Sequence, residues 1–219
     1  MTLKNFIIVL IYLLSDLVFS QSSKSFIKTR DSLLLLPNDS VKVDQLIVFC
    51  KQNDDEHFIE VLELSKKVEK LTNDLKLFKR KAKLYNTIGD IHFTKANYIE
   101  SFKYYSEAYR LSDSIKSKFH LAMSAYNLGW QAAIQQKNYK DVSYIYFALG
   151  IGQELKSDAI ILRTQNALGS FYTDKYDREH KVADFDSAAK DFVVSIALLK
   201  YFAAESKSAT LCSRSYLSV

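Results

Sequence analysis

The side chains that could perform acid–base, nucleophilic or metal chemistry are few and scattered in this sequence. None of the four histidines has a second histidine or cysteine three or four positions away, the spacing that places two metal ligands on one face of a helix. The histidines are His57, His92, His120 and His180, and the cysteines are Cys50 and Cys212. There is no serine elbow motif and no glycine-rich phosphate loop. We therefore expect no enzymatic activity, no cofactor and no metal site.

The elements that must position any binding residue are predicted to be long helices, because turn-forming residues are scarce. Five of the 219 residues are glycine and one is proline, roughly 3% against an average near 12%. Hydrophobic residues make up 48% of the chain and charged residues 25%, which indicates a packed globular protein rather than a disordered one. Folds built from many tight turns are thereby excluded.

The N-terminal segment, residues 1–20, has the composition of a secretory signal peptide. Lys4 precedes the apolar run Phe6–Leu14, and Val18-Phe19-Ser20 supplies the small or β-branched residues at a cleavage site. The mature protein would begin near Gln21 and be periplasmic or secreted. The alternative is an uncleaved inner-membrane anchor formed by residues 6–19, and only in that case do we expect membrane association.

Basic residues are concentrated in one stretch, although the whole chain has a net charge of +5. Eight basic and two acidic residues lie between Lys66 and Lys83. Lys76, Lys79, Arg80 and Lys83 follow an i, i+3, i+4, i+7 pattern, which predicts that they share one helix face. This basic face is either a solvated surface or a docking site for an acidic partner. No recognition motif for nucleic acid accompanies it, so we expect no nucleic-acid partner.

Three glycines, Gly89, Gly129 and Gly169, are evenly spaced along the chain. In the unit around Gly89, apolar residues of 75–92 and 98–112 recur at spacings of three and four, which predicts a pair of helices with one buried stripe each. The stripes are Phe78, Ala82, Tyr85, Ile88 and His92, then Tyr98, Phe102, Tyr105, Ala108, Tyr109 and Ser112. Because glycine weakens a helix by about 1 kcal/mol relative to alanine, its recurrence predicts a close helix crossing at each unit.

The residues around these glycines resemble the tetratricopeptide repeat, W-x2-L-G-x2-Y…A-x3-F. Ile88-Gly89, Leu128-Gly129 and Leu168-Gly169 match its centre, and Ser101-x3-Tyr105, Val142-x3-Tyr146 and Ala188-x3-Phe192 match its second half. The resemblance implies an all-α fold, a right-handed superhelical solenoid of antiparallel helix pairs. Asn73-Asp74 and Asn97 are predicted to supply turn or N-cap chemistry between helices.

The repeat divides the chain into predicted segments. Phe26–Leu36 is expected to be a short helix ended by Pro37, and Asn38-Asp39-Ser40 the next N-cap. The segments are a signal peptide at 1–20, a lead-in helix and turn at 21–40, four helix pairs at 41–81, 82–121, 122–161 and 162–200, and a capping helix or truncated fifth repeat at 201–219. Cys50 and Cys212 would then lie tens of Å apart, beyond the roughly 7 Å limit of a disulfide, so no intramolecular bridge is expected.

The resemblance also implies a concave groove lined by the first helix of each pair. The positions it assigns to this groove are Lys83, Asn86, Asp90, Tyr126, Asn127, Trp130, Arg163, Asn166 and Ser170. Amide and cationic groups of this kind could hold an extended peptide. Trp130 is either its aromatic anchor or a buried wedge between units. Residues 173–180, an insertion relative to the earlier units, are expected to form a charged surface loop.

Two functions remain open at this point. The first is an exported, non-catalytic scaffold that binds a protein or peptide in the groove. The second is a sensory input domain, because residues 31–44 and the evenly spaced repeats after them look like the N-terminal region of bacterial sensor histidine kinases and helix-turn-helix regulators. None of the kinase motif residues is present, so an output domain would have to come from a separate protein or a longer reading frame.

Overall fold

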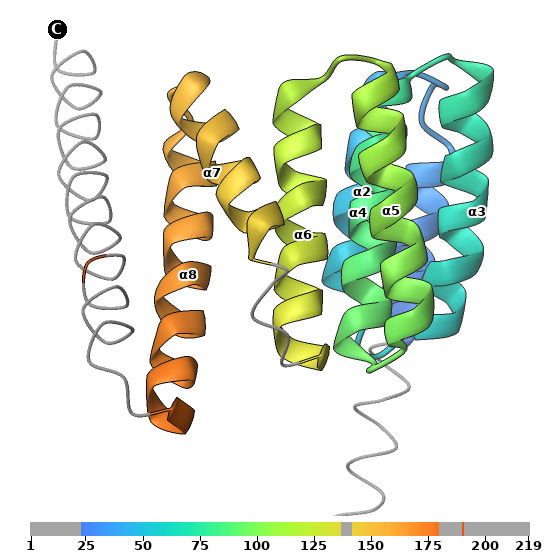
Figure 1. Cartoon of the computed structure of the whole chain (residues 1–219). Coiled ribbons are helices and arrows are strands. Elements are labelled where there is room, and N and C mark those ends of the chain that lie inside the picture. Colours follow the sequence, from blue (N-terminus) through green and yellow to red (C-terminus); the bar gives the residue numbers. More distant parts are fainter. Residues whose placement is uncertain (1–22, 137–141, 180–189, 191–219) are drawn as a thin grey trace, which may run out of the picture. The chain divides into compact units, whose positions relative to one another are not determined.

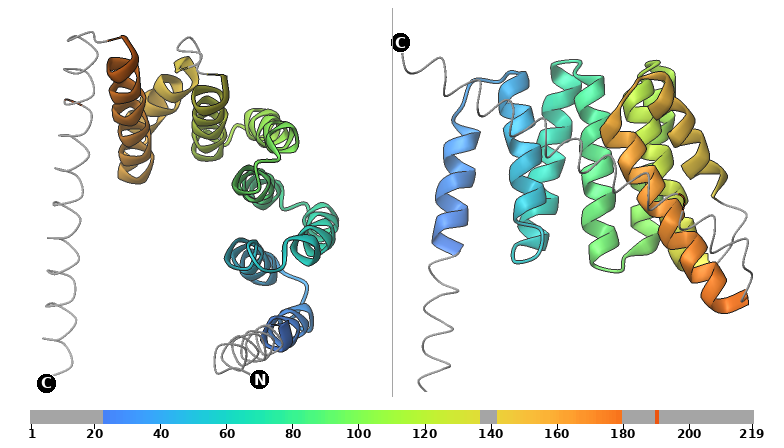
Figure 2. Two further views of the ribbon diagram at one scale, coloured as in Figure 1. Left: turned by 90° about the horizontal axis from the view of Figure 1, so that it is seen from below. Right: turned by 90° about the vertical axis from the view of Figure 1, so that its left-hand side faces the viewer.

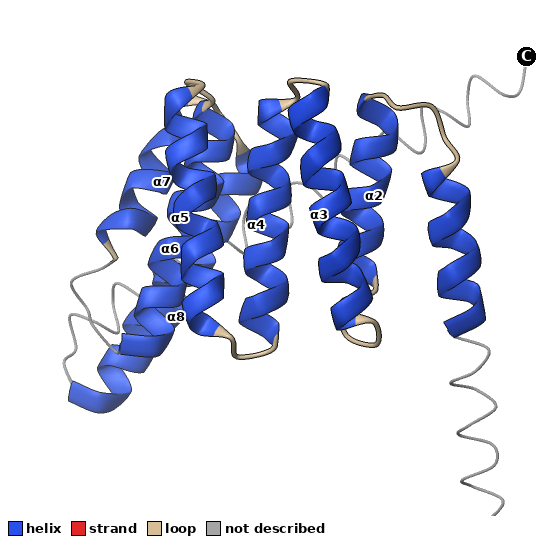
Figure 3. Ribbon diagram, turned by 90° about the vertical axis from the view of Figure 1, so that its right-hand side faces the viewer, coloured by secondary structure: helices blue, strands red, loops and turns tan. Residues whose placement is uncertain are grey.

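The computed structural model describes residues 23–136, 142–179 and 190. All regular structure in these residues is helical, without a strand among them (Figure 3), so the predicted all-α class is confirmed. The first described helix covers residues 23–34. It is followed by α2 (Ser40–Gln52), α3 (Phe58–Asp74), α4 (Phe78–Thr94), α5 (Tyr98–Ser114), α6 (Lys118–Gln136), α7 (Ser143–Glu154) and α8 (Asp158–Glu179). No described helix is long and apolar enough to cross a membrane.

The helices follow a regular step along the chain. Helices α3, α4, α5 and α6 begin at a constant interval, at Phe58, Phe78, Tyr98 and Lys118, and α8 begins two such intervals after α6, at Asp158. The connections before α4, α5, α6 and α8 are turns of only three residues. Turns this short make α3 and α4, α5 and α6, and α7 and α8 antiparallel. The predicted unit boundaries at 82, 122 and 162 fall inside α4, α6 and α8, because the motif residues first appear one turn into each helix.

The turns between helices place a residue other than glycine in the left-handed region. Lys76, Ala96, Lys116 and Lys156 have φ angles of 54°, 57°, 53° and 50°. In each turn the next residue donates a backbone hydrogen bond to a carbonyl five positions earlier, as Asn97 does to His92 at 2.9 Å. This is the Schellman pattern of a helix C-terminus.

The predicted capping residues have mixed outcomes. Asp39 caps α2 as expected, because its carboxylate accepts hydrogen bonds from the backbone N–H groups of Val41 and Lys42, both at 2.9 Å. Asn97 is the N-cap of α5 but makes no side-chain capping bond. Asn73-Asp74 ends α3 just before the three-residue turn. Of the two roles predicted for the pair, turn or N-cap, the N-cap role is therefore wrong, because both residues lie at the end of a helix rather than before one.

The described residues fall into two compact units, one within Met1–Ile91 and the other within His92–Val219. In the first unit, α2 packs on α3 through fully buried Val43, Leu46, Val61 and Val68. Apolar side chains at these spacings give each helix one buried face. Hydrogen bonds from Tyr85 to Glu69 and from Lys81 to Asn73 join α4 to α3.

The helix over residues 23–34 is attached to the first unit by ring stacking and by a buried lysine. Phe26 stacks on Phe49 and on His57, with ring centroids 5.1 and 4.0 Å apart. Lys42 is 6% exposed, and its ammonium donates three hydrogen bonds, to the carbonyls of Leu34 and Leu36 at 2.6 and 2.9 Å and to Asn38 Oδ1 at 2.9 Å. A cation is favourable at a helix C-terminus, so Lys42 stabilises both this helix and the turn around Pro37.

In the second unit, α5, α6, α7 and α8 pack in chain order, α5 on α6, α6 on α7 and α7 on α8 (Figures 1 and 2). Buried Gln131 of α6 accepts a hydrogen bond from Ser101 Oγ at 3.1 Å and donates one to the carbonyl of Tyr98 at 2.7 Å, both in α5. A Cβ atom at Gly129 would lie 2.7 Å from Cγ1 of Ile145. The close crossing predicted at Gly129 is therefore confirmed, and it lies between α6 and α7.

The predicted buried stripes are correct in the middle of each helix and wrong at some ends. Ala82, Ile88, Tyr105 and Ala108 are buried, as are His92 and Ser112. Phe78, Tyr98 and Phe102 are 44%, 37% and 51% exposed, so their places in the stripe are corrected. Phe102 borders a pocket in the second unit.

Several predictions concern residues outside the described ranges. They are the signal peptide at 1–20, the second helix of the fourth pair with Ala188 and Phe192, the C-terminal helix at 201–219, and Cys212. Cys50 is a buried free thiol. Residues 173–179 of the expected surface loop continue α8, so the loop prediction is wrong for this part: the insertion lengthens the helix instead.

Candidate functional site

The groove residues predicted on α4 lie in the first unit, and each makes contacts there. Lys83 is exposed, and its ammonium lies 3.6 Å from Asp44 Oδ1. Asn86 is buried and donates a hydrogen bond to the carbonyl of Ala82 at 3.2 Å. Asp90 accepts a hydrogen bond from Lys51 at 3.3 Å. Lys83 and Asp90 are thus held in ion pairs, and the Asn86 side chain is hydrogen-bonded to the backbone of its own helix.

The groove residues predicted on α6 and α8 lie in the second unit. Trp130 is partly buried and packs on a cluster of Ile145, Ala167 and Leu168, together with Tyr126. Asn127 is 8% exposed. Arg163, Asn166 and Ser170 are on α8 at spacings that place them on one helix face. Trp130 thus packs against α7 and α8, and the choice between an aromatic anchor and a buried wedge stays a prediction.

The predicted basic face is only partly formed. Lys76 has a left-handed backbone in the turn before α4, so the prediction that it shares a helix face with the other three basic residues is wrong. Lys79, Arg80 and Lys83 are on α4. The Arg80 guanidinium lies 3.0 Å from Asp44 Oδ2, and Lys83 pairs with the same carboxylate. The Asp44 carboxylate reduces the positive charge that this surface offers to a partner.

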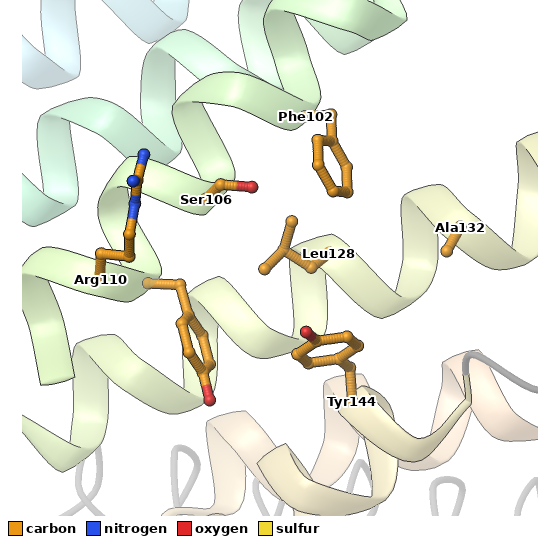
Figure 4. Close-up of a pocket in the computed structure, with 7 residues that line it drawn as sticks. Phe102, Ser106, Arg110, Leu128, Ala132 and Tyr144 are labelled. Carbon is orange, nitrogen blue, oxygen red and sulfur yellow. The ribbon is translucent and has the colours of Figure 1, made fainter.

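A pocket of about 340 Å³ opens in the second unit, at a place that the sequence did not predict. Helix α5 forms one side, α6 forms the floor, and α7 supplies Tyr144 (Figure 4). Its lining residues are Phe102, Ser106, Tyr109 and Arg110 from α5, Leu128 and Ala132 from α6, and Tyr144 from α7. None of the nine predicted groove residues belongs to it.

The pocket is mainly apolar and its walls contain three aromatic rings. Tyr109 and Tyr144 meet edge to face, with centroids 6.0 Å apart and planes at 90°. Phe102 and Tyr144 are 51% and 40% exposed, so both rings are accessible to a partner. Burial, with smaller effects of Tyr144 and Asp113, raises the pKa of the Tyr109 hydroxyl. Tyr109 therefore stays neutral at physiological pH and acts as an apolar wall with a polar tip.

Among the described residues that line the pocket, Arg110 alone is charged. Its guanidinium extends along α5 away from the rings (Figure 4) and lies 2.5 Å from Glu107 Oε1. Both side chains are largely solvent-exposed, 69% and 43%, and such pairs contribute little to stability. The guanidinium has five N–H donors, more than one carboxylate oxygen can satisfy.

No obvious reaction centre appears in the described part of the chain. Within it, no three His, Cys, Asp or Glu side chains gather as metal ligands would. His92 is buried beside the Tyr104 ring, at 5.7 Å between centroids. Burial lowers the pKa of His92, and Glu100 and Lys103 act on it in opposite directions. These features are explained by packing.

The comparisons with known proteins give no family for this chain. Neither a protein-family model nor a curated protein sequence matches it. The interpretation of its function therefore depends on its own residues and geometry.

The sequence did contain a signal for the pocket. Tyr105, Ala108 and Ser112 lie on the buried face of α5, whereas Phe102, Ser106 and Tyr109 follow each other at spacings of four and three on a neighbouring face. Reading the apolar residues of 98–112 as a single stripe merged these two faces. A second apolar stripe on a helix indicates a second contact surface.

Proposed function

We propose that the chain is an exported, non-catalytic scaffold of tetratricopeptide-like helix pairs that binds a protein or peptide. The pocket of α5, α6 and α7 is the observation that carries this proposal, because it combines exposed rings with one cation. Concave, mostly apolar sites with a few polar groups are the usual places for ligands. The constant step of the helices and their short turns support the repeat architecture.

A selection from a random peptide library displayed on phage tests the proposal. Peptides that bind the wild-type protein should lose binding to a Phe102→Ser variant, because the exposed ring supplies contact area that serine does not. Phe102 is 51% exposed, so this change should leave folding intact. Ile99→Ser is the matched control, since Ile99 is 86% exposed on the same helix and does not line the pocket.

The pocket as binding site is contradicted if no peptide is enriched, or if enriched peptides bind Phe102→Ser as well as wild type. Enriched peptides that instead lose binding in a Lys83→Ala, Arg163→Ala double variant would favour the groove implied by the repeat resemblance. The scaffold function would then stand with a different binding surface.

Export by residues 1–20 is a further part of the proposal, supported by the charge and apolar pattern of that segment. The experiment is expression of the full chain in a bacterial host, followed by fractionation and determination of the N-terminal residue. A mature chain beginning near Gln21 in the periplasm or medium is expected. Retention of residues 6–19 in the inner-membrane fraction would favour the anchored alternative.

The second candidate function is a sensory input domain, favoured by the likeness of residues 31–44 and the following repeats to bacterial sensor proteins. The adjoining DNA discriminates between the two candidates. A continuous downstream frame encoding a membrane span and a kinase or DNA-binding domain would favour the sensor. Its absence would favour the independent scaffold.

A further inference from the structure

The shape of the pocket defines the size of the group it can hold. Its volume of about 340 Å³ is near the lower end of the range for ligand sites, roughly 300–1,000 Å³. That space suits one large side chain rather than a whole cofactor. Three rings line it, and aromatic pairs prefer the edge-to-face and offset arrangements that such walls offer. An aromatic side chain is therefore the best-fitting occupant.

The charges around the pocket define what should adjoin that side chain. The acidic residues of α5 near the pocket are each within ion-pair distance of a base one turn away: Glu100 with Lys103 at 3.2 Å, Glu107 with Arg110 at 2.5 Å and Asp113 with Lys116 at 3.8 Å. Of these groups only Arg110 lines the pocket. Arg110 is thus the one charged side chain among the described lining residues. Its guanidinium points along α5 and pairs with Glu107, and its remaining N–H donors can bind a carboxylate that flanks a bound ring.

We propose that the pocket recognises a peptide segment in which an aromatic side chain is flanked by acidic residues. The ring fills the space between Phe102 and Tyr144, and a flanking carboxylate accepts hydrogen bonds from Arg110. This inference rests on the proposed function, since it specifies the ligand of the same pocket. In this proposal the rings of the pocket supply most of the affinity for the peptide, and Arg110 supplies the preference for acidic residues beside the aromatic side chain.

Two capped tripeptides of equal size test the preference, Ac-Asp-Phe-Asp-NH2 and its neutral counterpart Ac-Asn-Phe-Asn-NH2. Binding is followed by NMR chemical-shift titration of the full chain, which measures weak affinities. Wild type should bind the acidic peptide about fivefold more tightly, the size expected for a solvent-exposed charge contact. Raising the salt concentration from about 0.05 to 0.5 M should shrink this difference, because exposed charges are screened.

The variants separate the two roles. Arg110→Gln should remove the preference, so that both peptides bind equally, whereas Lys103→Gln should retain it. Lys103 is the matched control because it is 61% exposed on the same helix and pairs with a glutamate at i−3, as Arg110 does, without lining the pocket. Phe102→Ser should lower the affinity for both peptides by the same factor.

Each other outcome contradicts a defined part of the proposal. If both peptides bind wild type equally and Phe102→Ser weakens both, the inference about acidic partners is wrong while the pocket remains a binding site. A preference that persists in Arg110→Gln also overturns the inference. If neither peptide binds, or if Phe102→Ser has no effect on either, the pocket itself is not the site and the proposed function loses its main support.

Discussion

Cys50 shows how a single residue type can suggest chemistry that its surroundings prevent. Its thiol is fully buried, and Ser65 Oγ donates a hydrogen bond to Sγ at 3.7 Å. Burial raises the pKa of Cys50 to about 11, partly offset by the hydrogen bond from Ser65. A thiol of that pKa is not a thiolate at neutral pH, so Cys50 is a small apolar core residue rather than a nucleophile.

The raised pKa of Cys50 predicts a loss of stability in alkali. Because the folded pKa lies above the unfolded value of 9.0, the unfolded state releases its proton first. The contribution of the thiol is complete below pH 9 and is lost as the pH rises towards 11, with a loss on the order of 1 kcal/mol already reached at pH 10. Urea unfolding at pH 8 and pH 10 measures it. A Cys50→Ala variant should show a smaller loss over that interval, and an equal loss would contradict the buried thiol as its cause.

At the residue scale, the sequence predicted buried residues such as Ala82, Ile88 and Ala108 and did not predict the pocket of α5, α6 and α7. Whether Trp130 is an anchor or a wedge depends on Ile145, Ala167 and Leu168, which come from two other helices. The pocket beside Phe102 likewise has lining residues from three helices, Leu128 from α6 and Tyr144 from α7 among them. Neither is a local property of the sequence.

At the scale of elements, glycines within helices have opposite consequences at different positions. Gly129 faces Ile145 across the α6–α7 crossing, and a Cβ there would lie 3.1 Å from the backbone nitrogen of that residue. At Gly150 of α7, a Cβ would meet no neighbouring atom within 4 Å. Both are in helices, so both carry the intrinsic helix penalty of glycine.

Alanine substitution should therefore destabilise at one glycine and stabilise at the other. Gly129→Ala should lower the free energy of unfolding by about 1–3 kcal/mol through overpacking, and Gly129→Leu by more. Gly150→Ala should raise it by up to about 1 kcal/mol. Thermal denaturation of the two alanine variants is the measurement. A higher Tm for Gly129→Ala would show that α6 and α7 separate without cost.

The turns carry a second prediction at this scale. Ala96 is exposed with φ at 57°, a conformation that costs an L-residue with a Cβ about 1 kcal/mol. Ala96→Gly should therefore stabilise the protein by roughly 0.5–1 kcal/mol. Ala159→Gly is the opposed control, since Ala159 is exposed within α8 and should lose a similar amount. Chemical denaturation measures both, and equal signs would contradict the role of the left-handed turn.

These turns also explain what the sequence could predict about the elements. The even spacing of the glycines and the buried stripes predicted helices in the right places. The helix ends were less accurate because the usual signal, glycine at the left-handed position, is replaced by Lys76, Ala96, Lys116 and Lys156. Three lysines and an alanine are ordinary helix formers, so nothing in their type indicates a stop.

At the scale of the molecule, each compact unit has a core of its own. Val43, Leu46 and Val61 are buried in the first unit, and Ala125, Ala148 and Ile160 form a cluster in the second. In arrays where helices contact mainly their neighbours in sequence, stability is distributed along the chain rather than pooled.

A destabilising substitution in one unit should consequently leave the other unit unaffected. In Gly129→Ala, amide hydrogen exchange should become faster for α6 and α7, whereas amides of α2 and α3, such as those of Leu46 and Val61, should keep wild-type rates. Exchange measured by NMR or mass spectrometry on the full chain tests this. Equal acceleration throughout would show that the two units unfold as one.

The close approach at Gly129 also involves the wall of the pocket, because a Cβ at this position would point toward Tyr144 as well as Ile145. A Cβ at position 129 would lie 3.1 Å from Cβ of Tyr144, whose ring closes one side of the pocket. Any side chain introduced there pushes on the helix that carries this wall. Folding stability and the shape of the pocket are therefore linked at one position, so a side chain at residue 129 that lowers stability should also displace the pocket wall.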